Sequence, residues 1–376
     1  MRKQIYLDNA ATTKVKKEVV KEMEKYYLEN YGNPGSLHKL GEKAFEEISK
    51  ARAKLAKEIG AKVGEIYFTS GGTESDNWAL LGLAGGNPNK KTIIASSIEH
   101  PAVMEACGYL FNQGFKIIKI KVNNEGIIDI DELERELIKN KDVLLVSVMH
   151  VNNIIGVIQD LEEIGALCKK HGVLFHTDAV QGFGKLEIDV KKMNIDLLSA
   201  TAHKIGGPKG IGFLYIKEGI KISPLIYGGG QERGLRSGTE NVPGIIGFAK
   251  ALELQKKVNK KKIEKIRDKI MISLEKIGGK INGSRKRRIW NNVHASFSGV
   301  LGENLVVYLS ERGICVSAGS ACDSKKKSED RVLKAIGLPR ELQEGSIRIT
   351  LGEDISKKDA DYVIGEIGKA VGKLRI

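Results

Sequence analysis

The chain has 376 residues and a hydrophobic fraction of 41%, so two domains that share a cleft are expected rather than one core. No apolar run approaches the roughly 20 residues that span a bilayer, and the first residues hold no apolar signal core. We therefore expect a cytoplasmic protein with no membrane contact. Four cysteines are too few for a disulfide framework and lack metal-ligand spacing, so no metal is expected.

The net charge of +14 suits an acidic protein partner or nucleic acid, but much of the excess lies in local clusters. Lys256, Lys257 and residues 260–262 are expected on the wet side of one helix whose apolar positions run from Val258 to Ile277. Residues 285–288 are expected to form an exposed loop. Solvated faces therefore explain the charge more simply than direct nucleic-acid binding, which stays an alternative.

Short apolar strands alternate with amphipathic helices through the first two thirds of the chain. A helical face that ends at Gly60 precedes the first of these strands, and further helices are expected at 101–112 and 161–171. The expected strands are 65–69, 92–96, 116–122, 143–149, 173–176, 196–200 and 212–216. This alternation predicts an α/β fold with a mostly parallel sheet, whose ligands bind at the carboxyl ends of the strands.

After about residue 255 the pattern changes to a long basic helix and short strands near 293–297 and 346–351. We expect residues 16–255 to form a large domain, and residues 1–15 with 256–376 to form a smaller α+β domain. The glycine-rich stretch 228–239 is too polar for a strand and is expected to be an ordered loop at a ligand or subunit interface.

Lys204 lies between a run of small residues that ends a strand and a glycine-proline turn. A lysine held in this way can condense with an aldehyde, and its surroundings suit a phosphorylated pyridine aldehyde. The alternative is a solvated surface lysine, as most lysines are.

A phosphate-binding site is expected where Gly72 and Thr73 join a strand to a helix, because backbone amides and a hydroxyl converge there. A tight turn would need the same glycines, and the pattern is neither a P-loop nor a dinucleotide fingerprint.

Asp178 ends another strand, where a carboxylate can keep a pyridine nitrogen protonated; its alternative is a helix N-cap. Gln181 and Asn153 are candidates to hydrogen-bond the ring oxygen. His100 ends a third strand and suits stacking on the ring or proton transfer, with a capping histidine as the alternative.

Taken together, these motifs resemble the cysteine desulfurases, which are pyridoxal-phosphate enzymes of fold type I in the class V aminotransferase group. The resemblance runs from about Tyr6 to Leu351 in family order, although Ile154 stands where the family often has Glu. The matching segments are residues 6–13, 70–75, 150–153, 178–181, 203–204, 236–239 and 317–322. The fold implied is a large domain with a seven-stranded, mostly parallel sheet flanked by helices, plus the smaller α+β domain.

The resemblance also implies a role for each site residue. Lys204 would hold pyridoxal 5'-phosphate covalently, Asp178 would face its ring nitrogen, and His100 would be the stacking acid or base. The phosphate would be bound by Thr73, Thr201 and His203, with Thr239 contributed by the second subunit of a homodimer.

The resemblance also implies residues that bind the substrate. Arg348 would bind the substrate carboxylate, with help from Asn33. Cys322 lies in a small-residue run before a polar, lysine-rich stretch, which favours a mobile loop of the small domain over burial. A thiolate there can attack the sulfur of bound cysteine and carry it away as a persulfide. Cys107, Cys168 and, less clearly, Cys315 are expected to be small core residues.

The function implied is an L-cysteine desulfurase that yields L-alanine and passes persulfide sulfur from Cys322 to an acceptor protein. The acceptor would be an iron-sulfur scaffold or a tRNA-thiolation enzyme. One rival is a selenocysteine lyase or an aminoacyl-tRNA enzyme of the same fold. Another is a sulfur carrier or scaffold with a vestigial site, against which the intact set of Lys204, Asp178 and Cys322 argues.

Overall fold

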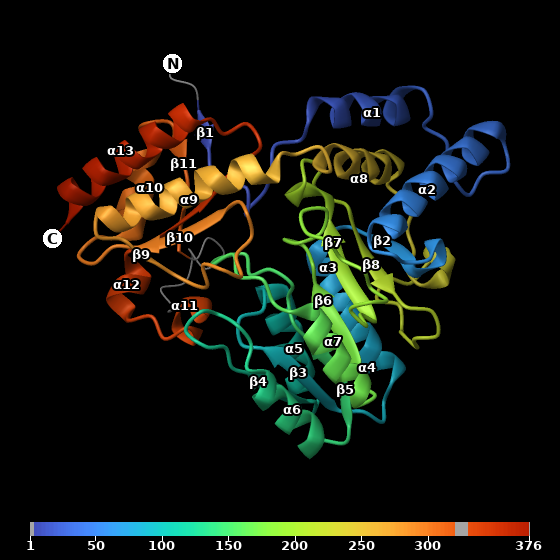
Figure 1. Cartoon of the computed structure of the whole chain (residues 1–376). Coiled ribbons are helices and arrows are strands. Elements are labelled where there is room, and N and C mark those ends of the chain that lie inside the picture. The colour runs from blue at the N-terminus through green and yellow to red at the C-terminus, as the bar shows by residue number, and fades with distance from the viewer. Residues whose placement is uncertain (1–3, 320–329, 376) are drawn as a thin grey trace.

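The computed structural model describes residues 4–319 and 330–375 (Figure 1). The strands of its largest sheet are β2 (Ile66–Thr69), β3 (Thr92–Ser96), β4 (Lys116–Ile120), β5 (Val143–Ser147), β6 (Leu174–Asp178), β7 (Leu197–Thr201) and β8 (Gly212–Ile216). Their order is β2-β8-β7-β6-β5-β3-β4. β8 is antiparallel to both of its neighbours, and the remaining pairs are parallel. The predicted seven-stranded, mostly parallel sheet is confirmed.

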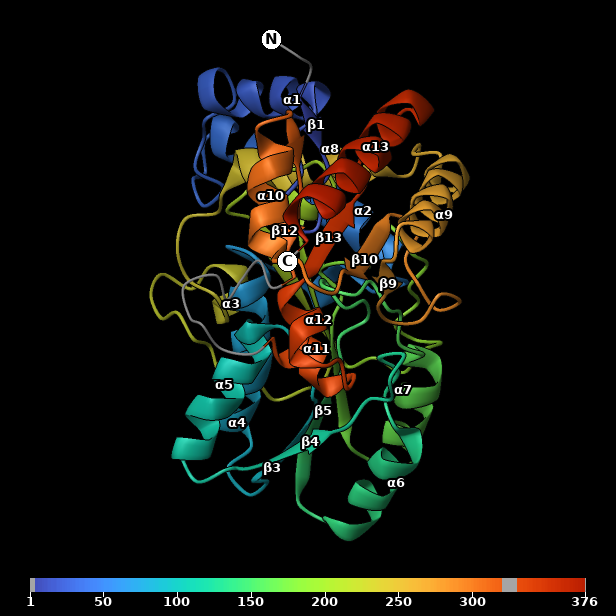
Figure 2. The same ribbon diagram turned by 90° about the vertical axis from the view of Figure 1, so that its left-hand side faces the viewer.

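Helices cover both faces of this sheet (Figures 1 and 2). One face packs against α2 (Lys39–Glu58), α6 (Ile130–Lys139), α7 (Leu161–Lys170) and α8 (Val242–Gln255), with α1 (Lys17–Leu28) resting on α8. The other packs against α3 (Gly72–Asn77), the π-helical turn η2 (Trp78–Gly82), α4 (Leu83–Gly86) and α5 (Pro101–Asn112). In β8, Phe213 and Tyr215 point to the first face while Leu214 and Ile216 point to the second, as strand geometry requires.

The C-terminal third builds a separate antiparallel sheet in the order β12-β13-β10-β9. Its strands are β9 (Lys280–Ile281), β10 (Asn292–Ser296), β12 (Ser317–Ala318) and β13 (Ser346–Thr350). Its helices are α9 (Lys260–Lys276), α10 (Gly302–Ser310), α11 (Arg331–Ala335), α12 (Arg340–Glu344) and α13 (Lys357–Leu374). The sheet with α9, α10 and α13 encloses its own cluster of buried apolar side chains, whereas α11 and α12 contribute to a cluster shared with Ile98, Val122 and Ile155.

The N-terminus joins this second region, because β1 (Ile5–Tyr6) pairs in parallel with β11 (Ile314–Cys315). Short 3-10 turns complete the described structure: η1 (Val63–Glu65), η3 (Ala202–Lys204) and η4 (Glu232–Gly234). None of the described helices is both long enough and apolar enough to cross a bilayer.

Two expectations about basic clusters are wrong. Lys256 and Lys257 do not lie on the helix that carries residues 260–262, since α8 ends at Gln255 and Asn259 caps a new helix by accepting from the Lys262 amide at 3.0 Å. Arg288 is buried rather than exposed. Its guanidinium donates to the Ser284 carbonyl and to Asn292 Oδ1, each at 3.0 Å, so it is a structural group.

Candidate active site

A cavity of about 310 Å³ lies at the carboxyl ends of the parallel strands, where α/β folds bind ligands. It is lined by every residue predicted to hold the cofactor except Thr239, and also by Arg348. The predicted set that meets here is Gly72, Thr73, His100, Asn153, Asp178, Gln181, Thr201, His203 and Lys204. Ala10, Ala11, Asp76, Met149 and Val180 complete the lining.

Lys204 lies on η3, directly after β7, and its amine is held by the N-terminal segment. Nζ donates to the carbonyl oxygens of Ala10 at 2.6 Å and Ala11 at 2.7 Å. Thr13 fixes this segment, since its hydroxyl donates to the His203 carbonyl at 2.8 Å and accepts from the Gly206 amide at 2.7 Å. The alternative of a solvated surface lysine is therefore wrong.

Asp178 ends β6 and is buried, with Oδ1 accepting from the Val180 amide at 2.9 Å. The alternative interpretation of a helix N-cap is wrong, because the residues after Asp178 form a turn, and the carboxyl lines the cavity. Burial raises the pKa of Asp178, while the neighbouring His100 and Lys204 oppose that rise. A cationic ring nitrogen would oppose it further, because an opposite charge favours the ionised carboxylate.

Asp76, on α3, is a second buried carboxyl that sequence reasoning missed. Asp76, His100 and Asp178 each offer a polar atom within 4.8 Å of the others. Burial and then the charge of Asp178 raise the pKa of Asp76 well above its ordinary value. Like charges this close disfavour joint ionisation, and of the two carboxyls Asp178 is the one whose pKa rise is opposed by the charges of His100 and Lys204.

His100 is the N-cap of α5, because Nδ1 accepts from the Ala102 amide at 3.1 Å. The ring hydrogen of the neutral form is therefore on Nε2. Burial lowers the pKa of His100, which keeps the ring neutral. The predicted capping contact of His100 is therefore confirmed. Its ring also lines the cavity, and its role on a cofactor ring stays a prediction.

The opposite end of the cavity carries donors suited to an anion. Burial, followed by the charge of Lys204, lowers the pKa of His203 to about 4, and its Nδ1 lies 3.1 Å from Thr12 Oγ1. The Thr201 hydroxyl donates to the Ile211 carbonyl at 3.0 Å, so its hydrogen must turn from that carbonyl to bind an anion. A Cβ on Gly72 would lie 2.6 Å from Val180 Cγ2, so only glycine lets the α3 N-terminus approach this turn.

Arg348 lies on β13 and is 1% exposed. Nη2 donates to Asp8 Oδ1 at 2.8 Å and Ser317 Oγ at 3.3 Å, and Nη1 donates to the Asn153 carbonyl at 3.1 Å. Among the described residues, the buried Nε has no hydrogen-bond partner. Asp8, Ser317 and Asn153 thus hold the two terminal nitrogens of the guanidinium, and the Nε hydrogen remains as a donor for a ligand. Asp8 was not predicted to act here, although it lies in a segment that the resemblance covers.

Two predicted site residues among those described do not line this cavity. Thr239 and Asn33 are exposed in the single chain and do not line it; Asn33 Oδ1 accepts instead from the Gly35 amide at 2.9 Å. Cys322 lies outside the described residues. Cys107 and Cys168 are buried as expected, and burial raises the pKa of each thiol to about 12. Cys315 is partly buried.

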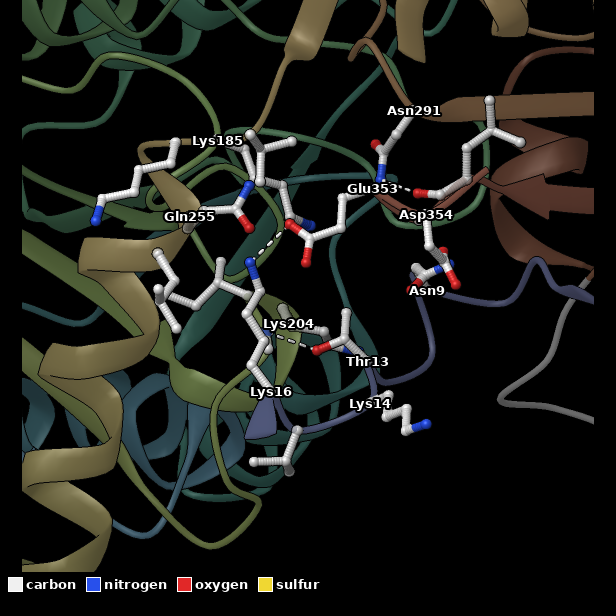
Figure 3. A pocket seen from close by; sticks show the side chains of 18 of the residues that line it. Asn9, Thr13, Lys14, Lys16, Lys185, Lys204, Gln255, Asn291, Glu353 and Asp354 are labelled. Carbon is white, nitrogen blue, oxygen red and sulfur yellow. Dashed lines mark hydrogen bonds and ion pairs between the residues drawn. The ribbon is translucent and has the colours of Figure 1, made fainter. Parts of the chain in front are cut away.

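A second cavity, of about 440 Å³, shares Lys204 with the first and opens between the two regions of the chain (Figure 3). Lys16 and Glu353 form an ion pair of 2.7 Å there. Lys185 and Gln255 also line it and are buried. Sequence reasoning assigned no role to these residues.

Comparison with known proteins identifies the family. The model of the family described as "Aminotransferase class-V" matches residues 5–363. "Cysteine desulfurase IscS" of Methanosarcina thermophila is 47% identical over 378 residues, which cover 99% of this chain and 93% of that protein. The protein of the same name from Dictyoglomus turgidum is 45% identical, with 100% and 96% covered. The chain belongs to the cysteine desulfurases of the class V aminotransferase family.

Solved structures of this family share the whole fold. A "NifS-like protein" superposes with a TM-score of 0.93 at 40% identity, covering 99% of this chain and 100% of that one. A structure described as "SspA in complex with cysteine" gives 0.83 at 36% identity, covering 92% and 98%. Cysteine desulfurases are enzymes that depend on pyridoxal phosphate, and the donors around Lys204, Asp178 and His203 fit that group.

Proposed function

We propose that the chain converts L-cysteine to L-alanine and collects the sulfur as a persulfide on Cys322. The observation that carries the proposal is the meeting of Lys204, Asp178, His100 and Arg348 in one cavity. When bound, pyridoxal phosphate supplies a protonated ring that withdraws electrons from the substrate α-carbon.

Each residue at the cofactor end has a role that its contacts support. Lys204 is the lysine that attaches the cofactor, with its amine aimed by the Ala10 and Ala11 carbonyls. Asp178 holds the proton on the ring nitrogen. His100, neutral and bearing hydrogen on Nε2, stacks on the ring and moves protons.

The polar residues at the edges of the cavity complete the cofactor site. Gly72, Thr73, Thr201 and His203 bind the phosphate, while Asn153 and Gln181 face the ring oxygen.

At the substrate end, Arg348 binds the α-carboxylate through donors that Asp8 does not occupy. Asn33 assists it. The thiolate of Cys322 attacks the substrate sulfur, the carbon-sulfur bond breaks, and the β-carbon that loses sulfur gains a proton. The products are alanine and a persulfide, so no external oxidant is needed.

Assembly and location belong to the same proposal. Thr239 is exposed and away from its own cavity, which supports a homodimer in which it reaches the partner's phosphate. The exposed apolar side chains of Leu37, Ile226 and Tyr227 supply apolar surface for such an interface. The sulfur acceptor is an iron-sulfur scaffold or a tRNA-thiolation enzyme in the cytoplasm.

We further propose that residues 16–255 form the cofactor-binding domain, and that residues 1–15 with 256–376 form a small domain carrying the Cys322 loop. The separate clusters of buried side chains around the two large sheets support this division, as does the pairing of β1 with β11.

The deciding experiment measures alanine and sulfide released from cysteine by purified protein loaded with pyridoxal phosphate. Borohydride reduction followed by peptide mass spectrometry should place the cofactor on Lys204. Lys204→Ala should remove the adduct and the turnover together. A wild type that stays colourless with added cofactor, or that turns over selenocysteine or a charged tRNA but not cysteine, would refute the proposal.

A further inference from the structure

Lys185 is a buried lysine that none of the roles above uses. It lies in the turn after β6 and is 4% exposed. Its ammonium donates to Gln181 Oε1 at 3.4 Å, which is a long hydrogen bond for so costly a group. Burial, and then the charge of Lys204, lowers the pKa of Lys185 to about 7.

Hydrogen bonds connect this lysine to the lysine of the active site. Gln181 accepts from Lys185 through Oε1 and donates through Nε2 to the Ala10 carbonyl at 2.9 Å. The same carbonyl accepts from Lys204 Nζ at 2.6 Å. The series of hydrogen bonds therefore runs from Lys185 through Gln181 and Ala10 to Lys204. It connects the second cavity with the first.

The spacing of Gln181 and Lys185 explains how the contact forms. The two residues are four apart in a tight turn in which Gly184 has a φ of 69° and the Lys185 amide donates to the Gly182 carbonyl at 2.9 Å, and this turn brings the two side chains together. With the protonated amine against Oε1, a flipped amide would place its NH₂ group against another donor. Lys185 thus selects the amide orientation that directs Nε2 at Ala10.

We propose that Lys185 is a positioning residue that, by fixing the Gln181 amide, holds the Ala10 carbonyl where it orients the Lys204 amine. This inference rests on the proposed attachment of the cofactor to Lys204. Stability alone gives no reason for a lysine at this position. Burying a charged amine costs free energy, and such local costs are typical of functional sites.

The test is a double-mutant cycle of Lys185→Met and Gln181→Leu, with cofactor affinity and melting temperature of the apoprotein as readouts. Each single variant should raise the dissociation constant for pyridoxal phosphate about three- to tenfold, the equivalent of one hydrogen bond. Because both act through one amide, the double variant should be no worse than Gln181→Leu. The double-variant apoprotein should melt at the wild-type temperature or above it, because replacing both partners of a buried hydrogen bond by apolar groups leaves neither unsatisfied.

Lys257→Met is the matched control. Lys257 lines the second cavity, as Lys185 does, but its side chain is 70% exposed. It should leave both readouts unchanged. Additive effects of the two substitutions on the dissociation constant, or a lower melting temperature for the double variant, would overturn the inference. A wild type that fails to bind the cofactor would instead refute the proposed function, so the two failures are distinct.

Discussion

The Arg348 guanidinium and the Asp8 carboxylate form an ion pair across the two ends of the chain, with Nη2 2.8 Å from Oδ1. Asp8 occupies one edge of the guanidinium, so a substrate carboxylate must use the rest of it. An arginine held in this way presents a fixed fork rather than a mobile charge.

Arg348→Lys should therefore raise the KM for cysteine about ten- to a hundredfold, because charge-assisted bidentate bonds contribute about 1.5–3 kcal/mol. The cofactor spectrum should be unchanged, since the substitution leaves Lys204 in place. Steady-state kinetics give the measurement. The control is Arg340→Lys, whose side chain is 74% exposed and pairs with Glu344 along α12. Equal KM values for both variants would contradict the role of Arg348.

Asp178→Asn should keep the cofactor but lose turnover by about a hundredfold or more, the usual scale for acid-base and electrostatic groups. An amide keeps the turn by accepting from the Val180 amide, but it cannot stabilise a charge on the ring nitrogen. Single-turnover rates with cysteine test this. A rate within about twofold of wild type would show that Asp178 serves only to accept the hydrogen bond from the Val180 amide.

Cys322→Ser should bind cysteine normally but release almost no alanine, since a hydroxyl is a poor replacement for a thiolate. Mass spectrometry of wild type after brief exposure to cysteine should find extra sulfur on the Cys322 peptide. Cys107 and Cys168 serve as internal controls, because thiols with a pKa of about 12 stay protonated at neutral pH. Sulfur found only on Cys315, with Cys322→Ser active, would move the nucleophile to that residue.

Mixing Lys204→Ala with Thr239→Ala should restore activity that neither variant has alone. If Thr239 serves the partner's site, one site of the heterodimer carries both substitutions and the other carries neither. Activity after co-refolding, with the mass from sedimentation, measures this. A fully active monomer would exclude a shared site.

Glu232→Gln should destabilise the fold by about 3–5 kcal/mol, the usual cost of leaving a buried charge unpaired. Glu232 accepts from both terminal nitrogens of Arg52 at 2.7 Å and from the Phe68 amide at 2.9 Å. Urea denaturation gives the free energy of unfolding. Lys62→Met breaks an exposed ion pair with Glu218 and should leave that free energy unchanged.

The parts of the site that lie within one strand and its following loop could be predicted from the sequence. β3 and β8 have their predicted bounds, and Asp178, Thr201 and Lys204 meet because parallel strands end at one edge. β6 continues past the predicted His176 because Asp178 still pairs with Ser199.

Other contacts could not be predicted, because they depend on tertiary packing. Nothing local indicates that the carbonyls of two alanines would hold Lys204, or that Lys185 and Asp76 would be buried beside the cavity. The burial of Arg288 is of the same kind, since its backbone forms a bridge with the distant Val157.

The hold of residues 8–13 on the active site also bears on synthesis. The Ala10 amide donates to Thr350 Oγ1 at 2.9 Å, and the Asn9 side chain donates to the Thr350 carbonyl at 2.8 Å. Other contacts of the same segment use residues made earlier, since Thr13 donates to the His203 carbonyl and Gln181 donates to the Ala10 carbonyl. On the ribosome, the contacts with Thr350 are the last to form, because that residue is synthesised near the end of the chain. The full set of contacts that orients Lys204 is therefore complete only after almost the entire polypeptide has emerged.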